Sequence, residues 1–170
     1  CPNFGITSVQ CYDEIPTATI LTQVEFEQLG DGLGKIGDSM CGIVVITATN
    51  NEFNGCNSDV IRTYTISVYA DYNLNGVREA NENTVMNTVT CSETFHVKDT
   101  IAPVFSGTLP VDVVVECNAI PVAENVQATD NCSEVIITSQ DEITLGACAN
   151  SYTIVRKWIA TDSCGNSVIH

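Results

Sequence analysis

Short runs of β-branched and aromatic residues, separated by polar residues, recur along most of the chain. Val, Ile, Thr and Tyr dominate these runs, and Asn, Asp, Gly or Pro bounds each of them, as is typical of β-strands between turns. Only residues 18–29 have a plausible helical pattern, and their Thr, Val and Phe content leaves that interpretation ambiguous. The sequence therefore predicts an all-β protein. The clearest strands are expected at residues 42–49, 60–70, 111–116, 135–139 and 152–161.

A degenerate internal repeat divides the chain. Its landmarks recur in the same order at near-equal spacing. They pair Cys11–Pro16 with Cys117–Pro121, Cys41 with Cys132, Cys56 with Cys148, Arg62 with Arg156, and Asp71 with Asp162. A Pro in the segment 99–103 ends the strand expected before it, which indicates a boundary. We therefore expect two tandem immunoglobulin-like β-sandwich modules, residues 1–99 and 100–170.

Charge and cysteine content narrow the class of protein. The chain has 170 residues, with 21 acidic and only 6 basic ones, for a net charge of −15. This balance argues against binding to nucleic acid or to an anionic membrane surface. No apolar run approaches the ~20 residues of a membrane span.

The cysteines indicate the compartment. The chain has nine cysteines without a C-x-x-C pair and only two His, which favours disulfides over zinc and predicts an extracellular location. With neither an initiator Met nor a signal peptide, we expect a mature or excised fragment.

Residues 71–82 carry a calcium-loop motif. They read D-Y-N-L-N-G-V-R-E-A-N-E and match the template D-x-[DN]-x-[DN]-G-x5-E at every fixed position. Calcium takes about six to eight hard oxygen ligands. Because a strand, not a helix, is predicted before the loop, we expect a structural ion and not a sensor. The alternative is a solvated Asn-rich turn. The expected ligands are the side chains of Asp71, Asn73, Asn75, Glu79 and Glu82 and the carbonyl of Val77.

A second ion near the module boundary is a weaker possibility. Asp99, with Asp130 or Asp162, could hold it. Such Asp residues more often cap turns through their own backbone, so both interpretations stay open at this point.

Four motifs give the chain a family resemblance. V-E-C-x-x-I-P, A-T-D-N-C, R-x-W-x-A-T-D-x-C-G-N and D-T-x-x-P-V are similar to the HYR-like and immunoglobulin-like repeats of giant Bacteroidetes surface proteins, which include gliding and attachment adhesins. The resemblance is strong over residues 99–170 and weaker over 1–98, where the calcium-type loop replaces the C-G-N element. It implies an extracellular adhesin or filament module. The D-[ST]-[aliphatic or Met] sites of Bacteroidetes O-glycosylation are similarly matched at Ser39 and Thr100.

The topology of an immunoglobulin-like module suggests how the cysteines pair. Successive strands run up and down, so the turns that carry the cysteines meet at the two ends of the sandwich. The expected disulfides are Cys117–Cys148 and Cys132–Cys164 in the second module, and by repeat equivalence Cys11–Cys56 and Cys41–Cys91 in the first.

Cys1 is left over in this scheme, and we expect it to pair outside the chain, to remain a free thiol, or to lack its partner in this fragment. The second module also ends before a last strand equivalent to that of the first. We therefore hypothesise that the N-terminal segment of one chain completes the last sandwich of its neighbour. A fragment boundary within a longer polypeptide is the alternative.

Function is expected to be structural. No nucleophile–base arrangement is recognisable, so we do not expect an enzyme. The leading hypothesis is a structural or adhesive repeat of an extracellular bacterial surface fibre, rigidified by calcium and disulfides. Its expected partners are neighbouring copies and surface glycans, without nucleic acid or membrane insertion. The alternative is a carbohydrate-binding accessory module of a secreted hydrolase, which would need exposed aromatic residues.

Overall fold

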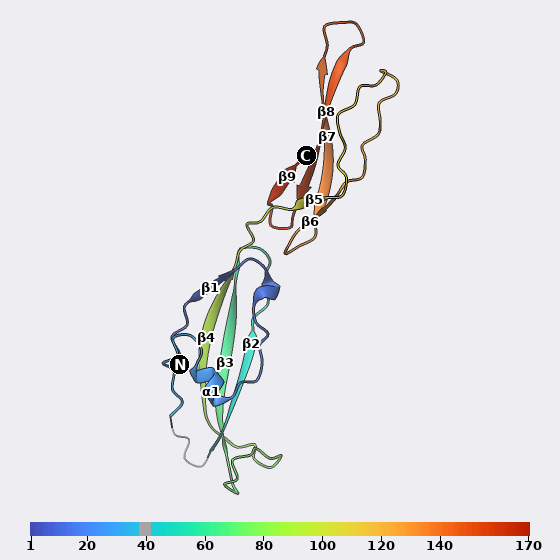
Figure 1. Cartoon of the computed structure of the whole chain (residues 1–170). Helices are drawn as coiled ribbons and strands as arrows, with labels where there is room; N and C mark the ends of the chain where they lie inside the picture. The colour runs from blue at the N-terminus through green and yellow to red at the C-terminus, as the bar shows by residue number, and fades with distance from the viewer. Residues whose placement is uncertain (38–41) are drawn as a thin grey trace. The chain divides into compact units, whose positions relative to one another are not determined.

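The chain forms two compact units, Cys1–Lys98 and Asp99–His170, each built mainly of β-strands (Figure 1). This computed structural model describes residues 1–37 and 42–170. The expectations that fall on Ser39 and Cys41 therefore lie outside the described residues. The second unit begins at Asp99, which is the first residue of the segment 99–103 where the sequence predicts a boundary.

The first unit contains one four-stranded sheet with the order β1-β4-β3-β2. β2, β3 and β4 are antiparallel neighbours, whereas β1 pairs with β4 in parallel. Two of these strands correspond closely to the predicted runs at 42–49 and 60–70. The strands are β1 (Ile6–Val9), β2 (Gly42–Asn50), β3 (Ser58–Ala70) and β4 (Val85–Val97).

The core of the first unit lies against one face of this sheet. Alternate residues of β3, from Val60 to Ile66, are buried, as the two-residue period of a strand requires. Phe26 packs edge-on against Tyr64, with 5.4 Å between ring centroids. Burial, and after it the hydrogen bond from Tyr64 to Glu93, raise the pKa of the Tyr64 hydroxyl to about 12. The inner-face cluster comprises Phe26, Ile46, Tyr64, Ile66 and Cys91.

The ambiguous segment 18–29 resolves into two short elements. Leu21 forms an isolated bridge with Ile46, and α1 (Gln23–Glu27) follows it. Thr22 and Glu25 begin the helix with a reciprocal capping box, in which the Thr22 side chain accepts from Glu25 N and the Glu25 carboxylate accepts from Thr22 N. A single-turn 3-10 helix, η1 (Tyr12–Glu14), precedes this segment.

The second unit has two smaller sheets. β5 pairs with β6, and β7, β8 and β9 form an antiparallel three-stranded sheet. Trp158 and Ala160 on β8 are buried, and the Trp158 indole N–H donates to the Glu124 carbonyl at 3.0 Å. The strands are β5 (Val104–Ser106), β6 (Gln127–Thr129), β7 (Ile136–Leu145), β8 (Tyr152–Thr161) and β9 (Ser167–Ile169).

The strand predicted at residues 111–116 is wrong. This segment has no regular secondary structure, and Val111, Val113 and Val114 are exposed. β-propensity reflects how well a side chain fits a pleated, half-buried surface, and no neighbouring strand supplies that surface here. The composition of the run was therefore a poor guide to its structure.

An arginine contact repeats in both units at equivalent positions of the internal repeat. Arg62 on β3 donates to the carbonyl of Pro16, and Arg156 on β8 donates to the carbonyl of Pro121 at 2.9 Å. In each case a central strand is tied to the segment that follows the first cysteine of its repeat. The two halves of the sequence repeat thus share a three-dimensional contact, which we call the arginine clamp.

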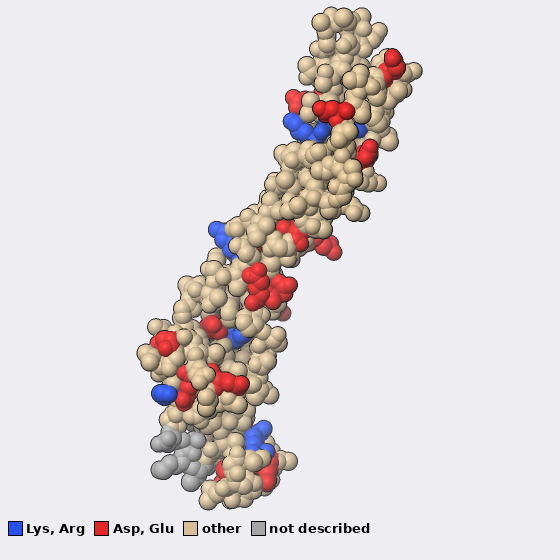
Figure 2. Space-filling model, in the orientation of Figure 1, with Lys and Arg blue, Asp and Glu red and all other residues tan. Residues whose placement is uncertain are grey.

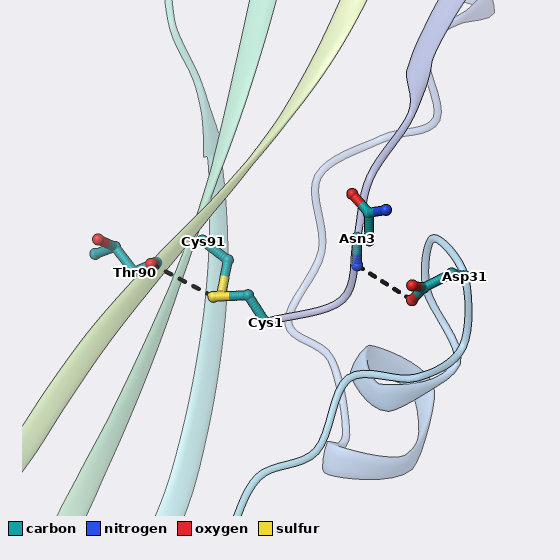
Figure 3. Close-up of a disulfide and its surroundings, with 5 residues drawn as sticks. All are labelled: Cys1, Asn3, Asp31, Thr90 and Cys91. Atoms are coloured by element: carbon teal, nitrogen blue, oxygen red, sulfur yellow. Dashed lines mark hydrogen bonds between the residues drawn. A yellow bond between two sulfur atoms is a disulfide. The ribbon is translucent and has the colours of Figure 1, made fainter.

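The N-terminal segment belongs to its own unit. β1 lies along β4, with Ile6 opposite Thr94, and Asn3 N–H donates to Asp31 Oδ1 at 3.1 Å (Figure 3). Cys1 is bonded to Cys91 of the same chain. In this structure the segment lies along β4 of its own chain, and strand exchange with a neighbouring chain stays a prediction.

Candidate functional site

The predicted calcium loop connects β3 to β4. β3 ends at Ala70, and the loop closes through Ala70 N–H, which donates to Thr84 O at 2.9 Å. The Tyr72 hydroxyl and Thr84 Oγ1 lie 2.7 Å apart and add a second contact near the base. Residues 71–82 are thus held between the ends of two long strands, which fixes where the loop begins and ends.

Asp71 organises the first half of the loop. Its Oδ1 accepts from Asn75 N–H at 3.3 Å, and its Oδ2 accepts from Gly76 N–H at 2.8 Å. The chain turns sharply here, with positive φ values of 58° at Leu74 and 74° at Gly76. Glycine adopts this conformation without steric cost, which explains the fixed Gly of the motif.

Glu82 closes the second half of the loop from inside. Glu82 is 0 % exposed. Its Oε1 accepts from Tyr72 N–H and its Oε2 accepts from Glu79 N–H, both at 2.9 Å. A buried carboxylate is costly unless it is hydrogen-bonded or paired with a cation. A carboxylate can accept in about four lone-pair directions. The two N–H donors use only part of this capacity, so a further partner can bind.

The remaining predicted ligands share the same network. Asn73 Oδ1 accepts from Asn75 N–H at 3.0 Å, and Asn75 Oδ1 accepts from Val77 N–H at 2.7 Å. The amide groups of Asn73 and Asn75 both donate to the Glu79 carboxylate at 3.2 Å. The structure therefore brings all five predicted side-chain ligands into one network, and Val77 joins it through its backbone N–H.

This donor set fits a hard cation. Every side chain in the network offers oxygen, with no His or Cys, and oxygen-only sites suit Ca²⁺ rather than zinc or copper. The carboxylates themselves are not tightly gathered. Within residues 1–37 and 42–170, one group of three acidic, Cys or His side chains has ligand atoms within 4.8 Å of one another, and it lies elsewhere, at Asp99, Asp130 and Cys132.

The first disulfide differs from the expected one. Cys91 is bonded to Cys1, with 5.8 Å between their Cα atoms, so the predicted Cys41–Cys91 bond is wrong (Figure 3). The parallel pairing of β1 with β4 is the physical reason, because it carries the chain start alongside the strand that holds Cys91. Cys91 is buried in the core of the unit.

Four further cysteines, Cys11, Cys56, Cys132 and Cys164, are disulfide-bonded. They are the cysteines of the predicted pairs Cys11–Cys56 and Cys132–Cys164. The residues next to Cys132 and Cys164 are in contact, because Ser163 N–H donates to Ser133 Oγ at 3.2 Å. Three disulfides indicate an oxidising environment, as found outside the cell or in secretory compartments.

The predicted Cys117–Cys148 bond is also wrong, since both cysteines are free, exposed thiols. They line one open pocket, and Tyr152 donates from its hydroxyl to the Cys117 carbonyl at 3.3 Å. Both lie in loops without buried neighbours, so packing does not hold them in the narrow geometry that a disulfide needs.

Acidic side chains are spread over both units on the face drawn in Figure 2, with few basic ones among them. Thr100, the described candidate for O-glycosylation, is exposed. In the part of the chain that the structure covers, no helix is long and apolar enough to cross a membrane. No protein-family model matches the chain, and no curated protein is significantly similar to it. What the loop does is therefore inferred from its geometry.

Proposed function

We propose that this chain is a repeat module of an extracellular bacterial surface fibre or adhesin, in which one calcium ion and several disulfides stiffen immunoglobulin-like β-modules. The observation that carries the proposal is the loop network closed by Glu82. A fully buried Glu82 carboxylate, which accepts from two backbone N–H groups of the loop that Asp71 and Asn75 also organise, is a feature expected of a calcium loop.

Calcium would supply charge neutralisation and cross-linking within the loop. Asp71, Glu79 and Glu82 contribute the carboxylates, Asn73 and Asn75 contribute amide oxygens, and the carbonyl of Val77 completes the set. The role is structural, because a β-strand enters the loop and another leaves it, so no helix pair is present to open on binding.

A repetitive array suits the remaining features. The arginine clamp occurs at equivalent positions of both units, which supports a duplicated module. Disulfides suit a protein that works outside the cell. Neighbouring copies and surface glycans are the proposed partners, and a glycan on Thr100 would extend from an exposed position.

The experiment that tests the calcium assignment compares wild type with Glu82→Gln. Free calcium about thirty-fold above Kd should stabilise the wild-type first unit by about 2 kcal/mol, which raises Tm by roughly 10 °C. Glu82→Gln removes one ligand charge and should lose this shift. Thermal melting with calcium or chelator can be followed by near-UV circular dichroism of the tyrosines, four of which lie in this unit.

Glu52→Gln is the matched control, because it removes the same charge from an exposed position of the same unit. It should keep the full calcium response. An equal Tm for wild type in calcium and in chelator would contradict the assignment.

The second candidate function is carbohydrate binding, as an accessory module of a secreted hydrolase. One observation favours it: Tyr12 and Phe53 are stacked with ring centroids 4.8 Å apart, and both rings are partly exposed. Aromatic faces of this kind can bind sugar rings. A glycan array tests this candidate, since saccharide binding that is lost in Tyr12→Ala would assign sugar recognition to the stacked pair, and no binding would count against it.

A further inference from the structure

Two carboxylates of the second unit each have a buried oxygen without a hydrogen-bond partner. These atoms are Asp99 Oδ2 and Asp130 Oδ2. Asp99 is 8 % exposed, and Asp130 is partly buried. One carboxylate oxygen from each residue and the Cys132 sulfur lie within 4.8 Å of one another. The two acidic groups are therefore close neighbours in an environment from which water is largely excluded.

Turn formation accounts for only one oxygen of each group. Asp99 Oδ1 accepts from Ile101 N–H at 3.0 Å. Asp130 Oδ1 accepts from Cys132 N–H at 2.9 Å and from Ser133 N–H at 3.0 Å. Both residues thus cap turns in the expected way, and capping still leaves each Oδ2 without a partner.

Asp162, the third acidic residue considered from the sequence, is engaged differently. Its Oδ1 accepts from Cys164 N–H and Asn166 N–H, and its Oδ2 accepts from the Asn166 amide, all at 2.8 Å. The same amide group also donates to the Asp99 carbonyl at 3.3 Å. Asp162 therefore holds the turn that positions Asp99, and each of its oxygens already has a hydrogen-bond donor.

Electrostatics makes the arrangement of Asp99 and Asp130 costly without a cation. Two like charges repel strongly where the local dielectric is low, and each unpartnered oxygen has lost its hydration. In the described part of the chain, no Lys, Arg or His forms an ion pair with either group. Cys132 is disulfide-bonded, so its sulfur is not a thiolate and does not favour a soft metal.

We propose that Asp99 and Asp130 bind a second calcium ion, within the second unit and independent of the 71–82 loop. The two Oδ2 atoms supply the charge, and carbonyl oxygens and water complete the shell that a hard cation needs. Asp99 begins the unit and Asp130 follows β6, so the ion cross-links the entry of the chain to the turn after that strand.

Binding stoichiometry tests this inference separately from the loop. Calcium titration by calorimetry should give two ions for wild type, one for Asp130→Asn, one for Glu82→Gln and none for the double variant. Asp130→Asn keeps an oxygen for the Cys132 and Ser133 N–H groups, so its turn is retained. If wild type and Asp130→Asn each bind one ion and Glu82→Gln binds none, the second site would be overturned and the loop assignment would remain.

A spectroscopic measurement confines the test to the second unit. Trp158 is the single tryptophan of the chain and is buried there. In the Glu82→Gln background, calcium should raise the Tm reported by Trp158 fluorescence by on the order of 5 °C. Adding Asp130→Asn should abolish the shift and raise Tm in chelator, since the new amide can donate to Asp99.

Asp112→Asn is the charge-matched control, as Asp112 is exposed in the same unit. It should keep both the shift and the second ion. The proposal would be overturned if calcium does not change the Tm reported by Trp158. It would also be overturned if Asp112→Asn abolishes the calcium-induced shift as Asp130→Asn does.

Discussion

Replacing Cys1 by Ser together with Cys91 by Ala should lower the free energy of unfolding of the first unit by roughly 3–4 kcal/mol. The bond joins residues 90 positions apart, so its loss frees a long loop in the unfolded chain. The N-terminal segment should also detach more readily, because β1 has only four residues with which to hold β4. Urea unfolding under oxidising conditions, followed by tyrosine circular dichroism, measures the loss.

The double variant Cys117→Ser/Cys148→Ser is the control for this experiment. Both residues are exposed free thiols, so their replacement should leave unfolding unchanged. A large loss of stability in the control, with little loss in the Cys1/Cys91 variant, would mean that the cysteines pair otherwise than described above.

Arg62→Ala should destabilise the first unit by roughly 3 kcal/mol. Arg62 is 5 % exposed, and its guanidinium donates to the Pro16 carbonyl and to Asn50 Oδ1. It also lies 4.9 Å above the centre of the Phe95 ring. Hydrogen bonds from charged groups contribute about 1.5–3 kcal/mol each, and the buried stem and cation–π contact add to them. Urea unfolding provides the measurement.

Arg156→Ala provides the comparison in the second unit. Arg156 makes the equivalent bond to Pro121, but its guanidinium is more exposed and is paired with Asp141. Solvent screens such a pair, so the loss should be smaller than for Arg62. Equal losses in the two units would contradict the role of burial in the arginine clamp.

Sequence patterns predicted three of the long strands well, but β4 was not among the clearest expected runs and the run at 135–139 covers only part of β7. The short strands were missed. β8 begins and ends at the predicted residues, and β2 and β3 differ by at most two positions. These strands carry enough consecutive Val, Ile, Thr and Tyr to define a period. β5, β6 and β9 have three residues each, too few for any period to be visible. Residues 111–116 have the composition of a strand but lack a pairing partner.

The candidate loop could be located from the sequence because its chemistry fixes residue types at set spacings. The motif did not reveal that Glu82 is completely buried, since burial depends on how the loop folds back between β3 and β4. The bond of Cys1 was missed for a related reason. Repeat equivalence offers no partner for Cys1, and only the parallel pairing of β1 brings it to Cys91. The unpartnered oxygens of Asp99 and Asp130 are likewise a property of packing.

The bond between Cys1 and Cys91 also sets how the first unit would carry a mechanical load. Traction applied between Cys1 and Lys98 would pass through the covalent bond directly into the middle of β4. Residues 2–90, including β2, β3 and the 71–82 loop, would bear none of that force. Only residues 91–98 would lie in the path of the force, and their full extension of about 25 Å is little more than their length as a strand. Under tension the unit would act as a short, nearly inextensible link.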